Sequence, residues 1–120
     1  MTQTETIVDG YFDVWNESDS ARRRAKITSV WSADANYVDP MFAAHAVSEL
    51  DTLVSGLNQQ YPSHYFRCVG QPDMHHDRAR WSWEFLSPDG TLLMAGVDFA
   101  ILSADGKLQD VTGFFEPRPS

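Results

Sequence analysis

Asp98 is an ionisable residue inside an almost continuous apolar run, the stretch "MAGVDFAIL". An ionised carboxylate that is buried without partners is very costly, so it gains hydrogen bonds, pairs with a cation or keeps its proton through a raised pKa. Asp98 is therefore either a structural aspartate satisfied by its neighbours or an acid that faces a pocket.

A second carboxylate, Asp39, lies between aromatic and apolar residues in "NYVDPMF". Aspartate before proline is common where a turn begins, and the same carboxylate could serve as a general base. Tyr11 falls on the apolar side of a predicted helix, where it is either a core aromatic or a hydroxyl donor. None of these three residues is specific for chemistry by itself.

The remaining reactive side chains give weaker signals. His45, near the start of a predicted helix, is either simply exposed or able to exchange protons near neutral pH. His75 and His76 are adjacent on a predicted strand and should point to opposite faces, so we expect no shared metal ion. Cys68 has no partner for an intramolecular disulfide, and the sequence lacks the motifs of a serine nucleophile or a phosphate-binding loop. We expect neither metal nor cofactor.

Apolar residues at helical spacing predict three helices, at about Thr4–Asn16, Ala21–Ser32 and Ser48–Gln60. Extended segments follow the second helix ("NYVD") and the third, where the predicted strands are "HYFRCVG", "MHHDRARWSWEFL", "TLLMAGVDFAILS" and "LQDVTGFFE". "SPDG" and "ADGK" read as the turns between the last three. Helices followed by a meander of strands predict one α+β domain, residues 1–120, with helices on one face of an antiparallel sheet.

The strand that carries Asp98 is apolar on both faces. Leu93, Val97 and Ile101 share one face, and Met94 and Ala100 share the other. In so small a domain both faces need cover, from the helices on one side and from a second subunit on the other. The pattern therefore predicts a homodimer.

The charge of the chain argues against some partners. Seventeen acidic and nine basic residues give a formal net charge of -8, which repels phosphate backbones and anionic membrane surfaces. The N-terminal "MTQTETIVDG" lacks the features of a signal peptide, and no apolar stretch reaches membrane-spanning length. We expect a soluble cytoplasmic protein that binds neither nucleic acid nor membrane.

Three stretches, "YFDVWNESD", "DANYVDPMF" and "VDFAILSADGKLQDVTGFF", resemble the nuclear transport factor 2-like superfamily, particularly its SnoaL-like members and the ketosteroid isomerases. The resemblance covers almost the whole chain. It implies a cone-shaped curved antiparallel sheet wrapped around three N-terminal helices, an enclosed apolar pocket and, in many members, a dimer. Enzymes of this superfamily include isomerases, polyketide cyclases, dehydratases and epoxide hydrolases, while other members only bind or act as scaffolds.

The resemblance also assigns roles to residues. The site of ketosteroid isomerases corresponds here to Tyr11, Asp39 and Asp98. Asp39 would remove a proton next to a carbonyl, while Tyr11 and a protonated Asp98 would donate hydrogen bonds to the resulting oxyanion. The side chains expected to line the pocket, for a small flat apolar molecule, are Trp15, Trp31, Met41, Phe42, His45, Phe66, Trp83, Met94 and Phe114.

These observations lead to a small apolar-ligand-binding domain. The first interpretation is a cofactor-independent isomerase, cyclase or dehydratase that uses aspartate acid–base chemistry. The alternative is a non-catalytic module for small-molecule binding or for dimerisation.

Overall fold

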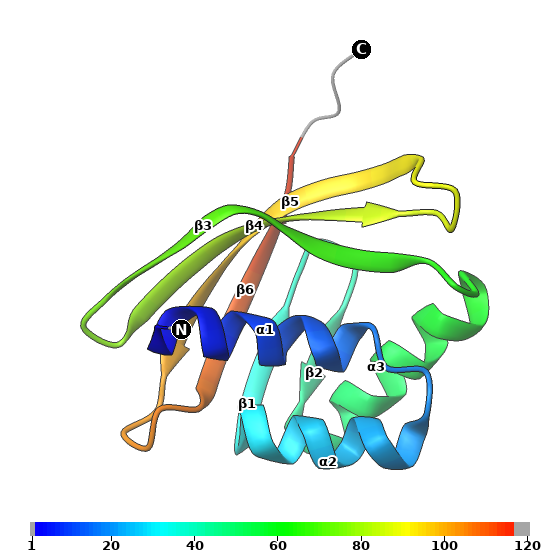
Figure 1. The fold of residues 1–120 in the computed structure, drawn as a ribbon. Coiled ribbons are helices and arrows are strands. Elements are labelled where there is room, and N and C mark those ends of the chain that lie inside the picture. Colours follow the sequence, from blue (N-terminus) through cyan, green and yellow to red (C-terminus); the bar gives the residue numbers. More distant parts are fainter. Residues whose placement is uncertain (1, 117–120) are drawn as a thin grey trace.

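Three helices pack on one face of a curved six-stranded sheet in the structure, a computed structural model that describes residues 2–116 (Figure 1). The helices are α1 (Gln3–Trp15), α2 (Ser20–Val30) and α3 (Ala46–Gln60). Within the described residues, no helix is both long and apolar enough to cross a membrane. The proline-rich end of the sequence, residues 117–120, lies outside the described residues.

The strands form one open, mixed sheet in the order β2-β1-β6-β5-β4-β3. They are β1 (Trp31–Val38), β2 (Ala43–His45), β3 (Tyr65–His75), β4 (Arg78–Leu86), β5 (Leu92–Leu102) and β6 (Leu108–Phe115). The predicted α+β class and the helix-covered sheet are confirmed. The sheet is mixed rather than antiparallel throughout, because β1 pairs with β6 in parallel. This pairing is possible because β2, α3 and three further strands separate β1 from β6, and parallel neighbours need such a long connection.

The helix ends follow local capping chemistry. The Thr2 side chain accepts the amide hydrogen of Glu5 at the start of α1, and Asp19 does the same for Arg22 at the start of α2. Helix α2 ends at Val30, two residues before the predicted end, and Trp31 begins β1 in extended backbone. The buried indole of Trp31 packs in the core from this strand, so tertiary burial overrides the helical pattern here.

The predicted strand of residues 74–86 is wrong as one element. Strand β3 continues to His75, which pairs with Arg78 of β4, so His76 and Asp77 form a two-residue hairpin turn. His76 adopts a positive φ of 52°, which is uncommon outside glycine and explains why the turn was not foreseen.

The long strands bend over the helices (Figure 1). The β3–β4 ladder has a register shift between Val69 and Asp73, and Gly70 within it has a φ of 72°. Bulges of this kind increase local twist and bend a strand. Asn16, at the end of α1, fastens the helix to β3 through two hydrogen bonds with the backbone of Phe66, at 2.9 Å and 2.8 Å.

A buried ion pair joins α2 to α3. Arg23 is 1 % exposed, and its Nη1 lies 2.6 Å from Oδ1 of Asp51, which is 4 % exposed. The Arg23 guanidinium also donates to the backbone carbonyl oxygens of Glu17 and Ser18. Burial alone would raise the pKa of Asp51, but hydrogen bonds, the largest from Arg23, outweigh burial and hold that pKa below its ordinary value.

Arg23→Ala should therefore lower the free energy of unfolding by about 3 kcal/mol, because it removes the buried cation from Asp51 Oδ1 and leaves Asp51 paired only with the largely exposed Arg24 on Oδ2. Arg22→Ala is the matched control, since the Arg22 side chain is 72 % exposed, and it should change stability by no more than about 0.5 kcal/mol. Urea unfolding at pH 7 measures both. Equal losses in the two variants would contradict the role given to the ion pair.

Candidate active site

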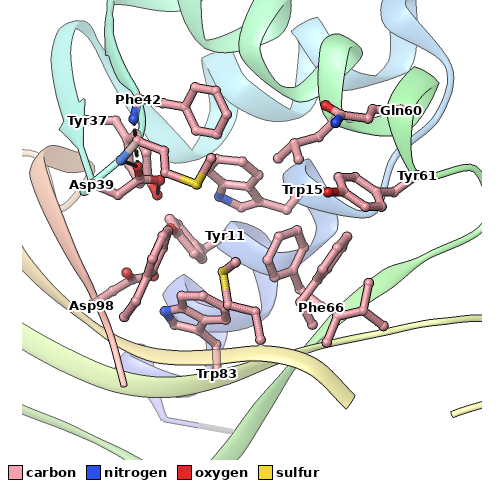
Figure 2. A pocket seen from close by; sticks show the side chains of 16 residues that line it. Tyr11, Trp15, Tyr37, Asp39, Phe42, Gln60, Tyr61, Phe66, Trp83 and Asp98 are labelled. Atoms are coloured by element: carbon pink, nitrogen blue, oxygen red, sulfur yellow. Dashed lines mark hydrogen bonds between the residues drawn. The ribbon is translucent and has the colours of Figure 1, made fainter. Parts of the chain in front are cut away.

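A cavity of about 280 Å³ lies between the helices and the sheet, with walls that are mostly aromatic and aliphatic (Figure 2). Helices α1 and α3, strands β1, β3, β4, β5 and β6, and the turn after β1 supply its lining. The lining residues are Tyr11, Trp15, Tyr37, Asp39, Met41, Phe42, Leu57, Gln60, Tyr61, Phe66, Trp83, Phe85, Leu93, Met94, Asp98 and Phe115.

Asp98 reaches this cavity from the middle of β5. It is 2 % exposed, and its Oδ2 accepts a hydrogen bond of 2.8 Å from the Tyr11 hydroxyl. Oδ1 of Asp98 has no hydrogen-bond partner within residues 2–116. Burial raises the pKa of Asp98 to about 7; the Tyr11 hydrogen bond opposes this rise, and the charge of Asp39 adds to it. Asp98 is therefore a carboxyl group that changes protonation near neutral pH.

Asp39 lies in the turn after β1 and is both a turn former and a cavity residue. Its Oδ1 accepts the amide hydrogens of Met41 (2.8 Å) and Phe42 (2.7 Å). Its Oδ2 accepts a 2.6 Å hydrogen bond from the Tyr37 hydroxyl. Three donors fix the orientation of this carboxylate, whose charge raises the pKa of Asp98. The turn therefore holds a negative charge in a fixed position at the cavity wall.

Two buried tyrosines hold the two aspartates. Burial, together with the charge of Asp98, raises the pKa values of Tyr11 and Tyr37 well above the ordinary tyrosine value. Both phenols therefore keep their protons and act as donors at any physiological pH. Tyr37 was not among the predicted site residues, although residues 37 and 39 share one face of an extended strand and their spacing could have paired them.

Gly113 brings the two acidic groups to the same end of the cavity. It pairs with Asp98 across β5 and β6. A Cβ atom at Gly113 would lie 2.8 Å from Asp98 Oδ1, 3.3 Å from Asp39 Cβ and 3.4 Å from the Tyr37 hydroxyl. These atoms thus surround a single point, and glycine leaves that point free of a side chain. Figure 2 shows Asp39 and Asp98 together at one end, while Gln60 and Tyr61 lie at the other.

The structure brings most of the predicted site residues together. Besides the three acid–base candidates, the predicted residues that line the cavity are Trp15, Met41, Phe42, Phe66, Trp83 and Met94. Trp31, His45 and Phe114 do not. Trp31 lies behind the wall, with its ring centroid 5.8 Å from that of Tyr11, and His45 is exposed, with its Nδ1 2.8 Å from Oδ1 of Asn36.

Phe114 is 52 % exposed on the outer face of β6, and its neighbour Phe115 lines the cavity instead. Successive side chains of a strand point to opposite faces, and Gly113 and Phe115 share the face of β6 that meets Asp98 and Gly96 of β5.

The other lining residues that were not predicted are Leu57, Gln60, Tyr61, Phe85 and Leu93. The helical spacing of Leu57, Gln60 and Tyr61 could have indicated them.

The reason given for separating His75 and His76 is wrong. Because His76 lies in the hairpin turn, the two rings are close, with 3.2 Å between their Nδ1 atoms. No group of three or more histidine, cysteine, aspartate or glutamate side chains placed to hold a metal ion occurs in the described part of the chain.

Solved structures provide the similarities to known proteins. A proposed isomerase of the SnoaL-like family from Agrobacterium tumefaciens str. C58 is 33 % identical, with a TM-score of 0.92 over 98 % of this chain and 100 % of that chain. An NTF2-like protein of unknown function from Exiguobacterium sp. 255-15 is 23 % identical (TM-score 0.68, 93 % of this chain and 99 % of that chain). A proposed polyketide cyclase from Sinorhizobium meliloti is 14 % identical (TM-score 0.71, 94 % and 99 %). No family model and no curated protein matches the chain.

The raised pKa of Asp98 predicts how stability depends on pH. The folded state keeps a proton that the unfolded state releases above the ordinary aspartate pKa of about 3.9, so stability should fall as the pH rises from about 4 to 7. The full effect is on the order of 4 kcal/mol. In Asp98→Asn this loss should disappear, whereas Asp13→Asn, on the exposed face of α1, should keep it. Urea unfolding at pH 5 and pH 8 measures the difference; a wild-type slope retained in Asp98→Asn would contradict the assignment.

Proposed function

Since this chain belongs to the SnoaL-like family, we propose that it is a cofactor-independent enzyme that moves a proton next to the carbonyl group of a small, flat, mostly apolar molecule. Isomerisation, cyclisation and dehydration all use this step. The observation that carries the proposal is Asp98, a buried carboxyl whose Oδ1 faces the cavity without a partner and whose pKa is raised to about 7. Such a group can hold or release a proton at neutral pH.

The two carboxyl groups suit different parts of the step. Asp39, held in position by three donors, is the base that takes the proton from the carbon next to the carbonyl. Protonated Asp98 donates a hydrogen bond from Oδ1 to the carbonyl oxygen as negative charge develops there. The electron pair of the broken C–H bond forms the enolate, and Asp39 then returns the proton to the same or another carbon.

Tyr11 acts here through Asp98. Its hydroxyl donates to Asp98 Oδ2, so the same hydrogen is not free for a ligand oxygen. The expectation that Tyr11 itself donates to the oxyanion is therefore replaced by a positioning role, in which Tyr11 turns Oδ1 of Asp98 toward the cavity. Tyr37 has the equivalent role for Asp39.

A second candidate function is binding without catalysis, as in a carrier or sensor. The observation that favours it is that both carboxylate oxygens of Asp39 already accept hydrogen bonds. Oδ1 accepts two from backbone amides, and Oδ2 accepts one from the Tyr37 hydroxyl. If Asp39 serves mainly to form the turn, it does not act as a base. The protein would then work only by binding a ligand in the cavity.

Asp39→Asn separates these two functions. Hydrogen–deuterium exchange of the C2 protons of 1-tetralone in D2O, followed by NMR, reports proton removal directly and needs no knowledge of the natural substrate. If the protein is an enzyme, wild type should accelerate this exchange, and Asp39→Asn should lose at least about a hundredfold of the acceleration while keeping its affinity for the ketone. Asp13→Asn is the control and should behave as wild type.

The pH dependence of the same exchange distinguishes the roles of the two aspartates. If Asp98 acts as a protonated donor, the rate should fall as the pH rises above about 7, because Asp98 then loses its proton. A rate that rises with pH through 7 would make Asp98 the base instead. Exchange that is unchanged in Asp39→Asn would reject Asp39 as the base, and a wild type that binds but does not accelerate exchange would support the carrier.

We also propose that the protein is a homodimer that pairs through the outer face of the sheet. Phe99 and Ile101 of β5 and Phe114 of β6 are 45 %, 37 % and 52 % exposed. The rings of Phe99 and Phe114 contact each other edge to face, with centroids 6.1 Å apart. Figure 1 shows the three helices on the opposite face of the sheet. Arg80 lies opposite Phe99, and Arg78 and Asp110 lie opposite Ile101, so the apolar patch has charged neighbours of both signs. A second copy is the partner that best fits an apolar patch with such a charged border.

The double variant Phe99→Glu, Phe114→Glu should be monomeric, because it places four carboxylates in a paired interface. Met41→Glu is the control, since Met41 is 64 % exposed but belongs to the turn after β1, and it should keep the wild-type mass. Sedimentation equilibrium at micromolar concentration distinguishes them. A monomeric wild type would reject the dimer.

A further inference from the structure

Four buried indole N–H groups lack a hydrogen-bond partner within residues 2–116, those of Trp15, Trp31, Trp81 and Trp83. A buried donor without an acceptor costs about 1–3 kcal/mol, and native proteins usually keep one for water, an ion or a function. Trp15 and Trp83 line the cavity, whereas Trp31 and Trp81 do not. Two of the four indole donors without a partner therefore belong to residues that line the cavity, and the other two do not.

Trp15 and Trp83 face the hollow from different walls. Trp15 comes from α1, with its ring centroid 5.2 Å from that of Tyr37 and 5.5 Å from that of Phe66. Trp83 comes from β4, 5.7 Å from Phe66 and 5.9 Å from Phe115. Each is only 6 % exposed. Figure 2 shows the nitrogen edge of both indoles turned toward the end that holds Asp39 and Asp98.

The position of Trp83 is fixed by the backbone beneath it. Its indole lies over Gly96 of β5, where an added Cβ would come within 2.4 Å of the ring. Gly96 is thus required for the ring to lie flat against the strand. The N–H groups of Trp83 and of Trp81, the cross-strand neighbour of Asp98, are both near enough to lower the pKa of Asp98. Neither indole nitrogen nor Asp98 Oδ1 has a hydrogen-bond partner within residues 2–116, and of the two indoles only Trp83 lines the cavity. One acceptor atom between Trp83 Nε1 and Asp98 Oδ1 would serve both.

We infer that Trp15 and Trp83 select the ligand by donating indole hydrogen bonds to its oxygen atoms. The ligand class is a flat, neutral molecule of one or two fused rings, with carbonyl-type oxygen at the acidic end of the cavity. Its rings lie between the two indoles, its oxygen meets the Trp83 N–H beside Asp98, and a second acceptor can meet the Trp15 N–H. The inference rests on the proposed function of this cavity and adds two specificity-determining residues to it.

Charge and size restrict the class. The ionised Asp39 at the same end would repel a carboxylate or phosphate, so the acceptor oxygen belongs to an uncharged group such as a ketone, ester or lactone. A volume of about 280 Å³ is at the lower limit of ligand pockets, which suits a bicyclic ketone. A hydrocarbon of the same shape would fill the cavity but leave both indole donors unsatisfied.

Wild-type protein tests this directly, because its four tryptophans give four indole N–H signals in a ¹⁵N–¹H NMR spectrum. Adding 1-tetralone should shift the signal of Trp83 downfield and move that of Trp15, while Trp31, which does not line the cavity, stays in place. Tetralin, which has the same bicyclic frame without oxygen, should produce no downfield shift. Trp→Phe variants at each position assign the signals.

Calorimetric affinities of the same two compounds give the second test. Wild type should bind 1-tetralone more tightly than tetralin, and Trp83→Phe should reduce this preference about five- to tenfold. Trp31→Phe removes an equally buried, unpartnered indole outside the cavity and should leave the preference unchanged.

The outcomes separate the two proposals. If 1-tetralone binds, Asp98→Asn weakens it, and neither Trp15→Phe nor Trp83→Phe alters the preference, then the indole inference is overturned and the proposed function stands. The same conclusion follows if all four indole signals ignore the ketone. If neither compound binds to wild type, both proposals fail.

Discussion

The burial of one carboxyl group in an aromatic shell is the constraint on which this site depends. Asp98 cannot be hydrated where it lies, so its stability comes from the Tyr11 hydrogen bond and from retaining a proton. That hydrogen bond joins residues 87 positions apart in sequence and locks α1 to the middle of β5. One contact therefore connects the position of α1 with the buried acid.

The cavity beside Asp98 stays open only if neighbouring side chains do not fill it. Glycines at positions 96 and 113 leave space where any side chain would strike Trp83 or Asp98. Large, stiff aromatic side chains then span the walls, and they cannot fold into the gap as flexible aliphatic chains could. On the far side of the helices, the Arg23–Asp51 pair fixes α2 to α3 at a distance from the cavity.

Much of the fold could be predicted from the sequence, because helical periodicity, turn residues and strand alternation are local signals. Asp39 and Asp98 were also recognisable as carboxylates among apolar residues, and the resemblance to ketosteroid isomerases joined them with Tyr11 in one site. Phe115 was missed for a different reason. Its role follows from the face of β6 that meets Asp98, and that face is known only once the sheet register is known. The hairpin at His76 depends on a positive φ that the sequence "HHDR" does not signal.

Within residues 2–116, three of the six buried side-chain polar atoms that lack a hydrogen-bond partner belong to residues that line one cavity, and this share is an argument about function. A domain selected for stability alone would replace a buried carboxyl by an apolar residue and give each indole an acceptor. Here the free Oδ1 of Asp98 and two of the four unpaired indoles face a single cavity, whereas the largest buried charge outside it, Arg23, is fully hydrogen-bonded. The same chain therefore satisfies a buried ion where none of the proposed chemistry occurs and leaves donors and acceptors open where a ligand would complete them. Ligand binding costs these polar atoms little desolvation free energy, because they were already removed from water when the protein folded.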